Sequence, residues 1–290
     1  GAEALLRFDL GVYRHISPEM VVDRVKEADI VIFAGGISPS LEGEEMYSVN
    51  SPGFAGGDRT SIELPQVQRD ILKALKKAGK KVVFVNCSGS AVALVPEMES
   101  CDAILQAWYP GQAGGLAVAD VLFGDFNPSG KLPVTFYKNT DQLPDFEDYS
   151  MKNRTYRYMT EVPLFPFGYG LSYTQFEYSD LTLDKEVINS NEYLTASITI
   201  TNKGTVDGKE IVQLYLRDVV GSVTRPLKEL KGYEKLFLKA GESKNVRFKI
   251  TPEMLRFYNY DIEYVYEPGE FDVMIGSNSR DVLTKRFILR

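Results

Sequence analysis

The hydrophobic and polar residues follow two different patterns along the chain. Up to about residue 125, continuous apolar runs alternate with segments in which apolar residues recur every three or four positions. The runs at residues 29–36 and 81–86 predict strands buried on both faces, because a strand with one exposed face carries polar residues at alternate positions. Residues 103–108 predict a third strand. We therefore expect a mostly parallel sheet.

The segments around these strands carry helix signals. Helices are predicted to begin at Pro18 and Pro65, because proline is well tolerated in the first turn, and a third helix is predicted at residues 113–123. Gly79 and Gly124 follow the second and third helices, and glycine often ends a helix. The alternation of helices and strands predicts an α/β sandwich domain with helices on both faces of the sheet.

The pattern changes beyond residue 126. Proline, glycine and aromatic residues interrupt the chain up to about residue 175, which predicts a connector packed on the first domain by its aromatic side chains. Farther on, apolar and polar residues alternate, as at residues 193–201, 211–216 and 245–250. Roughly seven short strands within about 115 residues are typical of an immunoglobulin-like or fibronectin type III-like β-sandwich.

Length and composition agree with a two-domain protein. The 290 residues are enough for two domains with their own cores. We expect an α/β sandwich domain at residues 1–150, an aromatic Pro/Gly-rich connector at residues 151–175 and a fibronectin type III-like domain at residues 176–290.

Charge and cysteine usage exclude several classes of partner. The net charge of −7 disfavours nucleic acid, and no apolar stretch is long enough to predict a membrane span. The N-terminus shows no signal-peptide pattern. Two cysteines, Cys87 and Cys101, and a single histidine cannot assemble a Cys/His zinc site, so both cysteines are predicted to be small buried residues. We expect no metal and no cofactor.

Three carboxylates follow the first predicted strand: Glu42, Glu44 and Glu45. Open α/β sheets bind their ligands beyond the carboxyl ends of the strands. A carboxylic acid placed there can act as a general acid where burial or a neighbouring carboxylate raises its pKa. From the pattern alone a solvated acidic loop is the simpler interpretation, and the catalytic interpretation stays open.

Two other chemistries find little support in the sequence. Gly35 and Gly36 follow a strand, but neither a G-x-G-x-x-G motif nor a P-loop lysine accompanies them, which argues against nucleotide binding. Ser88 lies outside any G-x-S-x-G motif and has only His15 as a possible base, which argues against a serine nucleophile.

Several longer motifs together resemble those of a known enzyme family. They are LEGE at 41–44, GDR at 57–59, IELP at 62–65, QAWYPGQAG at 106–114, LFGDFNPSGKLPVTF at 122–136 and PFGYGLSYT at 166–174. The whole chain resembles the C-terminal half of glycoside hydrolase family 3, most closely bacterial β-xylosidases and β-glucosidases. The last motif is similar to the family's link into its fibronectin type III-like domain.

The resemblance implies a retaining, exo-acting β-glycosidase that acts on a β-linked oligosaccharide or an aryl glycoside, without a cofactor. In the family an N-terminal (β/α)8 barrel, which is not in this sequence, carries the aspartate nucleophile. The α/β domain supplies the acid/base glutamate, which matches Glu42 best, then Glu44 and then Glu45. Asp58 and Arg59 are interpreted as a structural ion pair that closes the loop. This chain alone is expected to be inactive, and the enzyme to be periplasmic or secreted.

A different function remains open at this point. Trp108 and Tyr109 could stack on sugar rings in a non-catalytic carbohydrate-binding or scaffold module, although packing between domains is a simpler use of such side chains. The β-sandwich shows no cluster of polar residues that indicates chemistry, so it is expected to serve stability and domain packing.

Overall fold

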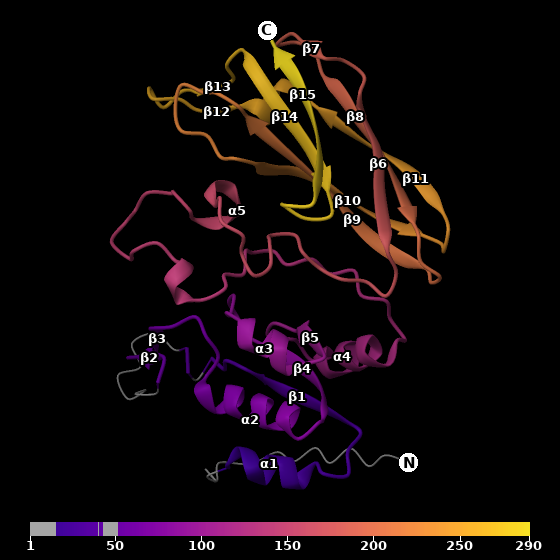
Figure 1. The fold of residues 1–290 in the computed structure, drawn as a ribbon. Coiled ribbons are helices and arrows are strands. Elements are labelled where there is room, and N and C mark those ends of the chain that lie inside the picture. The colour runs from indigo at the N-terminus through magenta and orange to yellow at the C-terminus, as the bar shows by residue number, and fades with distance from the viewer. Residues whose placement is uncertain (1–15, 40, 43–51) are drawn as a thin grey trace. The chain divides into compact units, whose positions relative to one another are not determined.

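The computed structural model describes residues 16–39, 41–42 and 52–290, which fall into two compact units. The first unit consists of two segments, the chain up to Ser90 and Leu94–Tyr109. The second comprises Ala91–Ala93 and Pro110–Arg290 (Figure 1).

The first unit is built on a parallel three-stranded sheet in the order β1-β4-β5 (Figure 1). Its strands are β1 (Ile30–Gly36), β4 (Lys81–Cys87) and β5 (Ala103–Gln106). The helices are α1 (Pro18–Arg24), α2 (Gln66–Lys77) and α3 (Val95–Ser100), and α2 packs against β4 and contacts both other helices. A small hairpin joins β2 (Phe54–Ala55) to β3 (Asp58–Arg59). The predicted parallel sheet with flanking helices is confirmed.

Helix α2 shows how the sequence pattern becomes packing. Ile71 and Leu75, two of the apolar residues at helical spacing, are buried against the sheet. The helix ends where Gly79 takes a left-handed φ of 74°, a conformation that glycine adopts without strain. Val67, expected on the same buried face, is 53% exposed, so the apolar face is narrower than the spacing suggests.

Strand β1 departs from the prediction of burial on both faces. Ile30 and Ile32 are 55% and 50% exposed, whereas Phe84 of the neighbouring β4 is fully buried. Exposed and partly buried residues alternate along β1, so one of its faces is open in the described part of the chain. A continuous apolar run indicates that both faces can be buried, but it does not specify which element covers them.

The second unit is dominated by a β-sandwich of a five-stranded sheet, β10-β9-β14-β15-β7, and a three-stranded sheet, β11-β8-β6. The strands are β6 (Phe176–Leu183), β7 (Val187–Ile188), β8 (Leu194–Asn202), β9 (Gly208–Asp218), β10 (Glu229–Leu238), β11 (Ser243–Ile250), β14 (Gly269–Gly276) and β15 (Val282–Leu289), with a separate hairpin of β12 (Phe257–Tyr258) and β13 (Tyr264–Val265). Alternate residues of β8, including Ile198 and Ile200, are fully buried in the core between the sheets. The prediction of a β-sandwich is confirmed.

Short helices and a long irregular segment precede the sandwich. They include α4 (Gly114–Phe123), the 3₁₀ turn Thr140–Gln142 and α5 (Thr155–Tyr158), and a further 3₁₀ turn, Pro252–Leu255, lies within the sandwich. The rings of Phe165 and Phe136, both in the second unit, are 6.2 Å apart, and the packing of the aromatic connector on the first domain stays a prediction. The connector packs on the sandwich, because the ring of Phe167 lies 6.4 Å from that of Tyr215. The domain boundaries at 150 and 175 stay a prediction.

Candidate functional site

The site begins where β1 leaves the sheet, and Gly36 fixes that point. Gly36 has a φ of 126°, and a Cβ built on it would lie 1.9 Å from the Cys87 carbonyl oxygen. The side-chain amide of Gln68, on α2, binds both polar groups of the Gly36 backbone, accepting from its N–H at 2.8 Å and donating to its carbonyl at 2.7 Å. The exit direction of the chain is therefore set by a glycine and one glutamine.

The next residues carry Glu42 to the carboxyl end of the sheet. The Ile37 N–H donates to the Cys87 carbonyl at 2.9 Å, and its side chain is 1% exposed, which anchors the segment. The Glu42 N–H then donates to the Ser38 carbonyl at 3.2 Å, which closes a turn. Glu42 thus lies beyond the carboxyl end of β1, where open α/β sheets place ligands.

Among the described residues, three side chains lie next to the Glu42 carboxylate. Its Oε1 accepts a hydrogen bond from Ser90 Oγ at 3.0 Å and lies 3.4 Å from Arg59 Nη1. Its Oε2 lies 3.5 Å from the Tyr109 hydroxyl. The side chain of Glu42 is 22% exposed and that of Arg59 12%, so the pair is largely shielded from water and still reachable. One carboxylate oxygen is held firmly, and the other is held weakly.

Ser90 is itself fixed by a polar network at the ends of β4 and β5. Arg59 Nη1 donates to Ser90 Oγ at 2.8 Å, and the buried Ser88 hydroxyl donates to the Ser90 carbonyl at 2.9 Å. Asn86 and Gln106 hydrogen-bond to each other at 2.6 Å and both donate to Ser88 Oγ. These hydrogen bonds hold Ser88 and Ser90 in one geometry, while the buried Oδ1 of Asn86 has no hydrogen-bond partner among the described residues. Ser88 is therefore a structural residue, not a nucleophile presented to substrate.

Tyr109 forms the exposed wall of the site. Its hydroxyl donates to the Ile37 carbonyl at 2.7 Å, and its side chain is 44% exposed. Burial, and after it the negative charge of Glu42, raises the pKa of the Tyr109 phenol, so the hydroxyl stays a donor. A Cβ on Gly89 would approach the Tyr109 ring to 2.7 Å, so this glycine leaves room for the ring. The preceding Trp108 has a φ of 57°, an uncommon conformation that often marks functional loops.

The structure tests some of the sequence interpretations here and not others. Glu42 lies at the expected edge, whereas Glu44 and Glu45 lie outside the described residues, so the choice among the three stays a prediction. The interpretation of Asp58 and Arg59 as a local ion pair is wrong: Arg59 pairs with Glu42, and Asp58 is exposed. Adjacent residues of a strand point to opposite sides, which separates the two side chains.

Sequence reasoning missed Ser90 and Gln68 and did not connect Tyr109 with Glu42. The signal that could have found two of them is positional. Ser90 follows β4 and Tyr109 follows β5, so both come after the carboxyl ends of parallel strands that neighbour β1. Such residues converge at one edge of a sheet. Gln68 carries no comparable signal, because it is one polar residue among several on α2.

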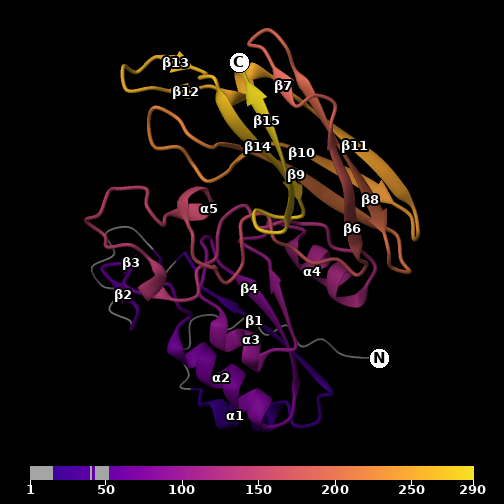
Figure 2. The same ribbon diagram turned by 45° about the horizontal axis from the view of Figure 1, so that its top comes forward.

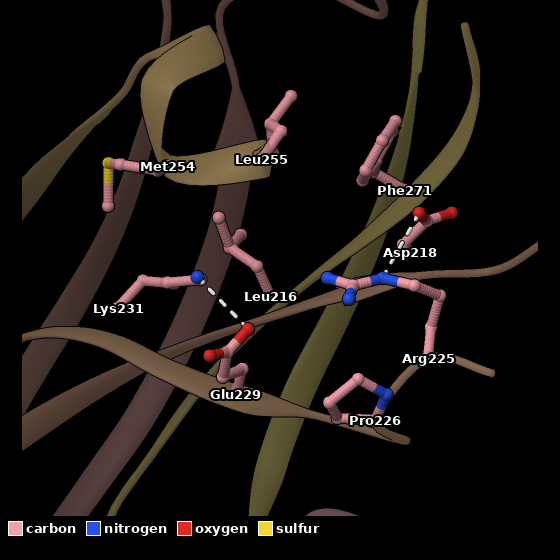
Figure 3. A pocket seen from close by; sticks show the side chains of 9 residues that line it. All are labelled: Leu216, Asp218, Arg225, Pro226, Glu229, Lys231, Met254, Leu255 and Phe271. Carbon is pink, nitrogen blue, oxygen red and sulfur yellow. Dashed lines mark ion pairs between the residues drawn. The ribbon is translucent and has the colours of Figure 1, made fainter. Parts of the chain in front are cut away.

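A hollow in the β-sandwich is too small to hold a ligand. Figure 3 shows Arg225 pointing at Asp218, with a distance of 3.5 Å, and Lys231 pointing at Glu229, with a distance of 3.0 Å. The guanidinium of Arg225 also lies 4.1 Å from the centre of the Phe257 ring. The remaining volume of about 10 Å³ corresponds to roughly one water molecule.

Two properties of the described residues bear on the kind of site. Histidine, cysteine and carboxylate side chains form no group of three or more there that could bind a metal ion. In the same part of the chain, every helix is too short or too polar to cross a bilayer. The chemistry available at Glu42 is that of a carboxyl group with hydroxyl and guanidinium neighbours.

Comparison with known proteins assigns both parts of the chain. Residues 14–173 match the model of the glycosyl hydrolase family 3 C-terminal domain, and residues 210–279 match that of a fibronectin type III-like domain. A xylan 1,4-β-xylosidase of Xylanibacter ruminicola is 53% identical over 99% of this chain and 33% of its own length. A periplasmic β-glucosidase of Salmonella typhimurium is 42% identical over 94% of this chain and 36% of its own length.

Solved structures agree with this assignment. A β-glucosidase from Erythrobacter marinus has a TM-score of 0.83 at 35% identity and covers 94% of this chain and 36% of its own. A β-glucosidase from Listeria innocua, solved with glucose, has a TM-score of 0.78 at 35% identity over 96% of this chain and 39% of its own. The chain spans about a third of the length of these relatives. It belongs to glycosyl hydrolase family 3, of which it carries the C-terminal domain followed by the fibronectin type III-like domain.

Proposed function

We propose that this chain is the C-terminal part of a retaining, exo-acting β-xylosidase or β-glucosidase, and that Glu42 is the general acid/base of the reaction. The observation that carries the proposal is the geometry of the Glu42 carboxylate. It lies at the carboxyl end of a parallel sheet, with Oε1 bound by Ser90 and paired with Arg59 and with Oε2 held weakly. Relatives named as β-xylosidase and β-glucosidase support the substrate class.

The proposed reaction uses two carboxyl groups about 5 to 5.5 Å apart. The nucleophile comes from a (β/α)8 barrel, which we place in the two-thirds of the relatives' length that this chain does not span. It attacks the anomeric carbon while Glu42 gives its proton to the leaving oxygen. Glu42 then takes a proton from the water that hydrolyses the glycosyl-enzyme.

The neighbours of Glu42 suit these two steps. Ser90 and Arg59 both act on Oε1, which leaves Oε2 to face the glycosidic oxygen. When Glu42 has lost its proton, the guanidinium of Arg59 stabilises the negative charge that forms. The half-exposed ring of Tyr109, beside Oε2, offers a flat face for the leaving sugar.

Leaving-group dependence in the full-length enzyme tests the role of Glu42. With Glu42→Gln, we expect kcat/KM for unactivated β-xylobiose or cellobiose to fall by about 10²- to 10⁴-fold, the usual contribution of general acid–base catalysis. Dinitrophenyl glycosides, whose leaving group needs no proton, should form the glycosyl-enzyme almost as fast as in the wild type. Equal losses for both substrate types would remove Glu42 from the acid role.

The dependence on a second domain has its own test. We expect the 290-residue chain alone to leave p-nitrophenyl β-xyloside and β-glucoside intact, and the chain joined to the barrel to hydrolyse at least one of them. Efficient turnover by the chain alone would contradict the proposed division of the active site. A periplasmic or secreted location is part of the proposal, because one relative is named as periplasmic, and cell fractionation of the producing organism tests it.

A further inference from the structure

The hairpin of β12 and β13 displays an unusual set of apolar side chains. Within seven residues, Tyr258, Tyr260, Ile262 and Tyr264 are 63%, 89%, 80% and 45% exposed. Figures 1 and 2 both show this hairpin at the margin of the sandwich, with its tip extending away from the two sheets. Exposed apolar residues that cluster in this way usually mark a binding surface, whereas single ones do not.

The turn at the tip of the hairpin is held rigidly. The side-chain carbonyl of Asn259 accepts from the N–H groups of Asp261 at 3.0 Å and Glu263 at 2.9 Å. In the backbone, the Asn259 N–H donates to the Glu263 carbonyl and the Ile262 N–H donates to the Asn259 carbonyl. Ile262 has a φ of 62°, which is strained for a β-branched residue. A turn this tightly bonded loses little conformational entropy on binding a ligand.

The aromatic rings at the base of the hairpin support one another. Tyr258 and Tyr264 face each other across the two strands, with ring centres 5.0 Å apart. The guanidinium of Arg256 lies 5.6 Å from the Tyr264 ring centre and pairs with Glu253 at 3.1 Å. These contacts fix the base, while the Tyr260 ring at the tip is almost fully in solvent.

We propose that this hairpin binds the sugar rings of a neutral β-linked polysaccharide. Tyrosine combines a flat apolar face, which matches the C–H face of a pyranose, with a hydroxyl that can bond to sugar hydroxyls. The carboxylates of Asp261 and Glu263, next to the exposed rings, add acceptors for sugar hydroxyls. Their charge disfavours anionic polymers such as nucleic acid or pectin.

The exposed hairpin of β12 and β13 and an exo-acting catalytic site would bind different parts of a polysaccharide. An exo-acting site needs a chain end, whereas an open hairpin can bind an internal stretch of polymer. The hairpin would then hold the enzyme on polysaccharide that supplies such ends. The inference rests on the hairpin's own side chains and does not depend on the role of Glu42.

Affinity electrophoresis of the full-length enzyme, with the 290-residue chain run beside it, tests the proposal. Native gels would contain soluble xylan, mixed-linkage β-glucan, polygalacturonate or no polymer. We expect xylan or β-glucan to retard both proteins, and Tyr260→Ala to weaken that binding about 3- to 10-fold, in the range of one aromatic contact. The double variant Tyr258→Ala/Tyr264→Ala should abolish retardation. The matched control is Tyr233→Ala, which removes a tyrosine 68% exposed on β10 and should leave binding unchanged.

The variants distinguish binding at the hairpin from unfolding, from binding at Glu42 and from self-association. Tyr260→Ala removes a side chain that is 89% exposed, so it should keep the wild-type melting temperature, and lost retardation cannot then be attributed to unfolding. Glu42→Gln should be retarded like the wild type, and loss of retardation in that variant would move binding to the proposed catalytic site. The proposal is overturned if neither neutral polymer retards the full-length enzyme, if polygalacturonate retards it more, or if Tyr260→Ala is retarded equally. Retardation of the 290-residue chain but not of the full-length enzyme also overturns it, because the hairpin would then be covered by the rest of the enzyme. It is also overturned if Tyr260→Ala acts only on a concentration-dependent dimer seen in sedimentation, which would assign the hairpin to self-association.

Discussion

The buried ion pair between Arg69 and Glu97 gives a quantitative prediction for the stability of the first unit. Arg69 Nε lies 2.9 Å from Glu97 Oε1, and the two side chains are 12% and 1% exposed. Removing one partner of such a pair leaves an uncompensated buried charge, which typically lowers stability by about 3–5 kcal/mol. We expect Arg69→Ala to lower the free energy of unfolding by this amount at neutral pH. That is a large part of the roughly 5–15 kcal/mol by which a folded domain is stable.

The loss of stability in Arg69→Ala should depend on pH. Burial raises the pKa of Glu97 above its ordinary value of 4.5, whereas Arg69 and Lys73 act in the opposite direction. A carboxyl whose pKa is higher in the folded state stabilises folding fully below its unfolded pKa, and this stabilisation is lost as the pH rises through the folded pKa. Without Arg69 the folded pKa rises further, and each added pKa unit corresponds to about 1.4 kcal/mol lost at high pH. Arg69→Ala should therefore be much less destabilising at about pH 4 than at about pH 8.

Urea unfolding followed by tryptophan fluorescence measures this effect, because the single tryptophan, Trp108, lies in the same unit as the ion pair. The matched control is Lys76→Ala, which breaks the pair with Asp102, whose side chains are both 45% exposed at a distance of 3.3 Å. Exposed pairs contribute about 0–1 kcal/mol, so the control should change little at either pH. A loss below about 1 kcal/mol in Arg69→Ala, or an equal loss at both pH values, would refute the reasoning.

Three further predictions concern other contacts. Tyr178→Phe removes a hydroxyl that donates to the buried Glu210 at 2.8 Å, so urea unfolding followed by circular dichroism should show a loss of about 1–3 kcal/mol, and an unchanged midpoint would contradict this. Gly36→Ala should abolish the cooperative unfolding transition followed by tryptophan fluorescence, because the added Cβ would lie 1.9 Å from the Cys87 carbonyl oxygen and the backbone φ of 126° is unfavourable for alanine. A wild-type unfolding transition would show that the backbone can move aside. Ser90→Ala in the full-length enzyme should lower kcat about tenfold or more with little change in KM, because it frees the Glu42 carboxylate oxygen that Ser90 binds at 3.0 Å. A change in KM alone would assign Ser90 to substrate binding.

The elements that the sequence predicted well are those defined by local periodicity. Strands β4 and β8 and helix α2 begin and end within two residues of the expected positions, because side-chain spacing and glycine position act over a few residues. The third predicted strand is shorter than expected, since β5 ends at Gln106 and Trp108 already has a left-handed backbone. Helix α3, with six residues, is too short to show a periodic pattern.

The site was predicted less completely, because its contacts join distant parts of the chain. The bond between Ser90 and Glu42 spans 48 residues, and that between Arg59 and Glu42 spans 17. Local spacing suggested Asp58 as the partner of Arg59, whereas strand pairing decides which side chains meet. The strand order β1-β4-β5 brings the segments after three strands together, and that order follows from the topology of the sheet rather than from any single motif.

Chemical rescue is the most direct test of Glu42 as the acid/base. In the full-length Glu42→Ala variant, turnover of a dinitrophenyl β-glycoside should stall at the glycosyl-enzyme, because no base activates water. Azide, a nucleophile that needs no base, should restore turnover and give a glycosyl azide of β configuration. Ser90→Ala, which keeps the carboxylate, should release the free sugar and show no azide rescue. Release of the free sugar at the wild-type rate by Glu42→Ala, with no β-glycosyl azide formed, would contradict the account.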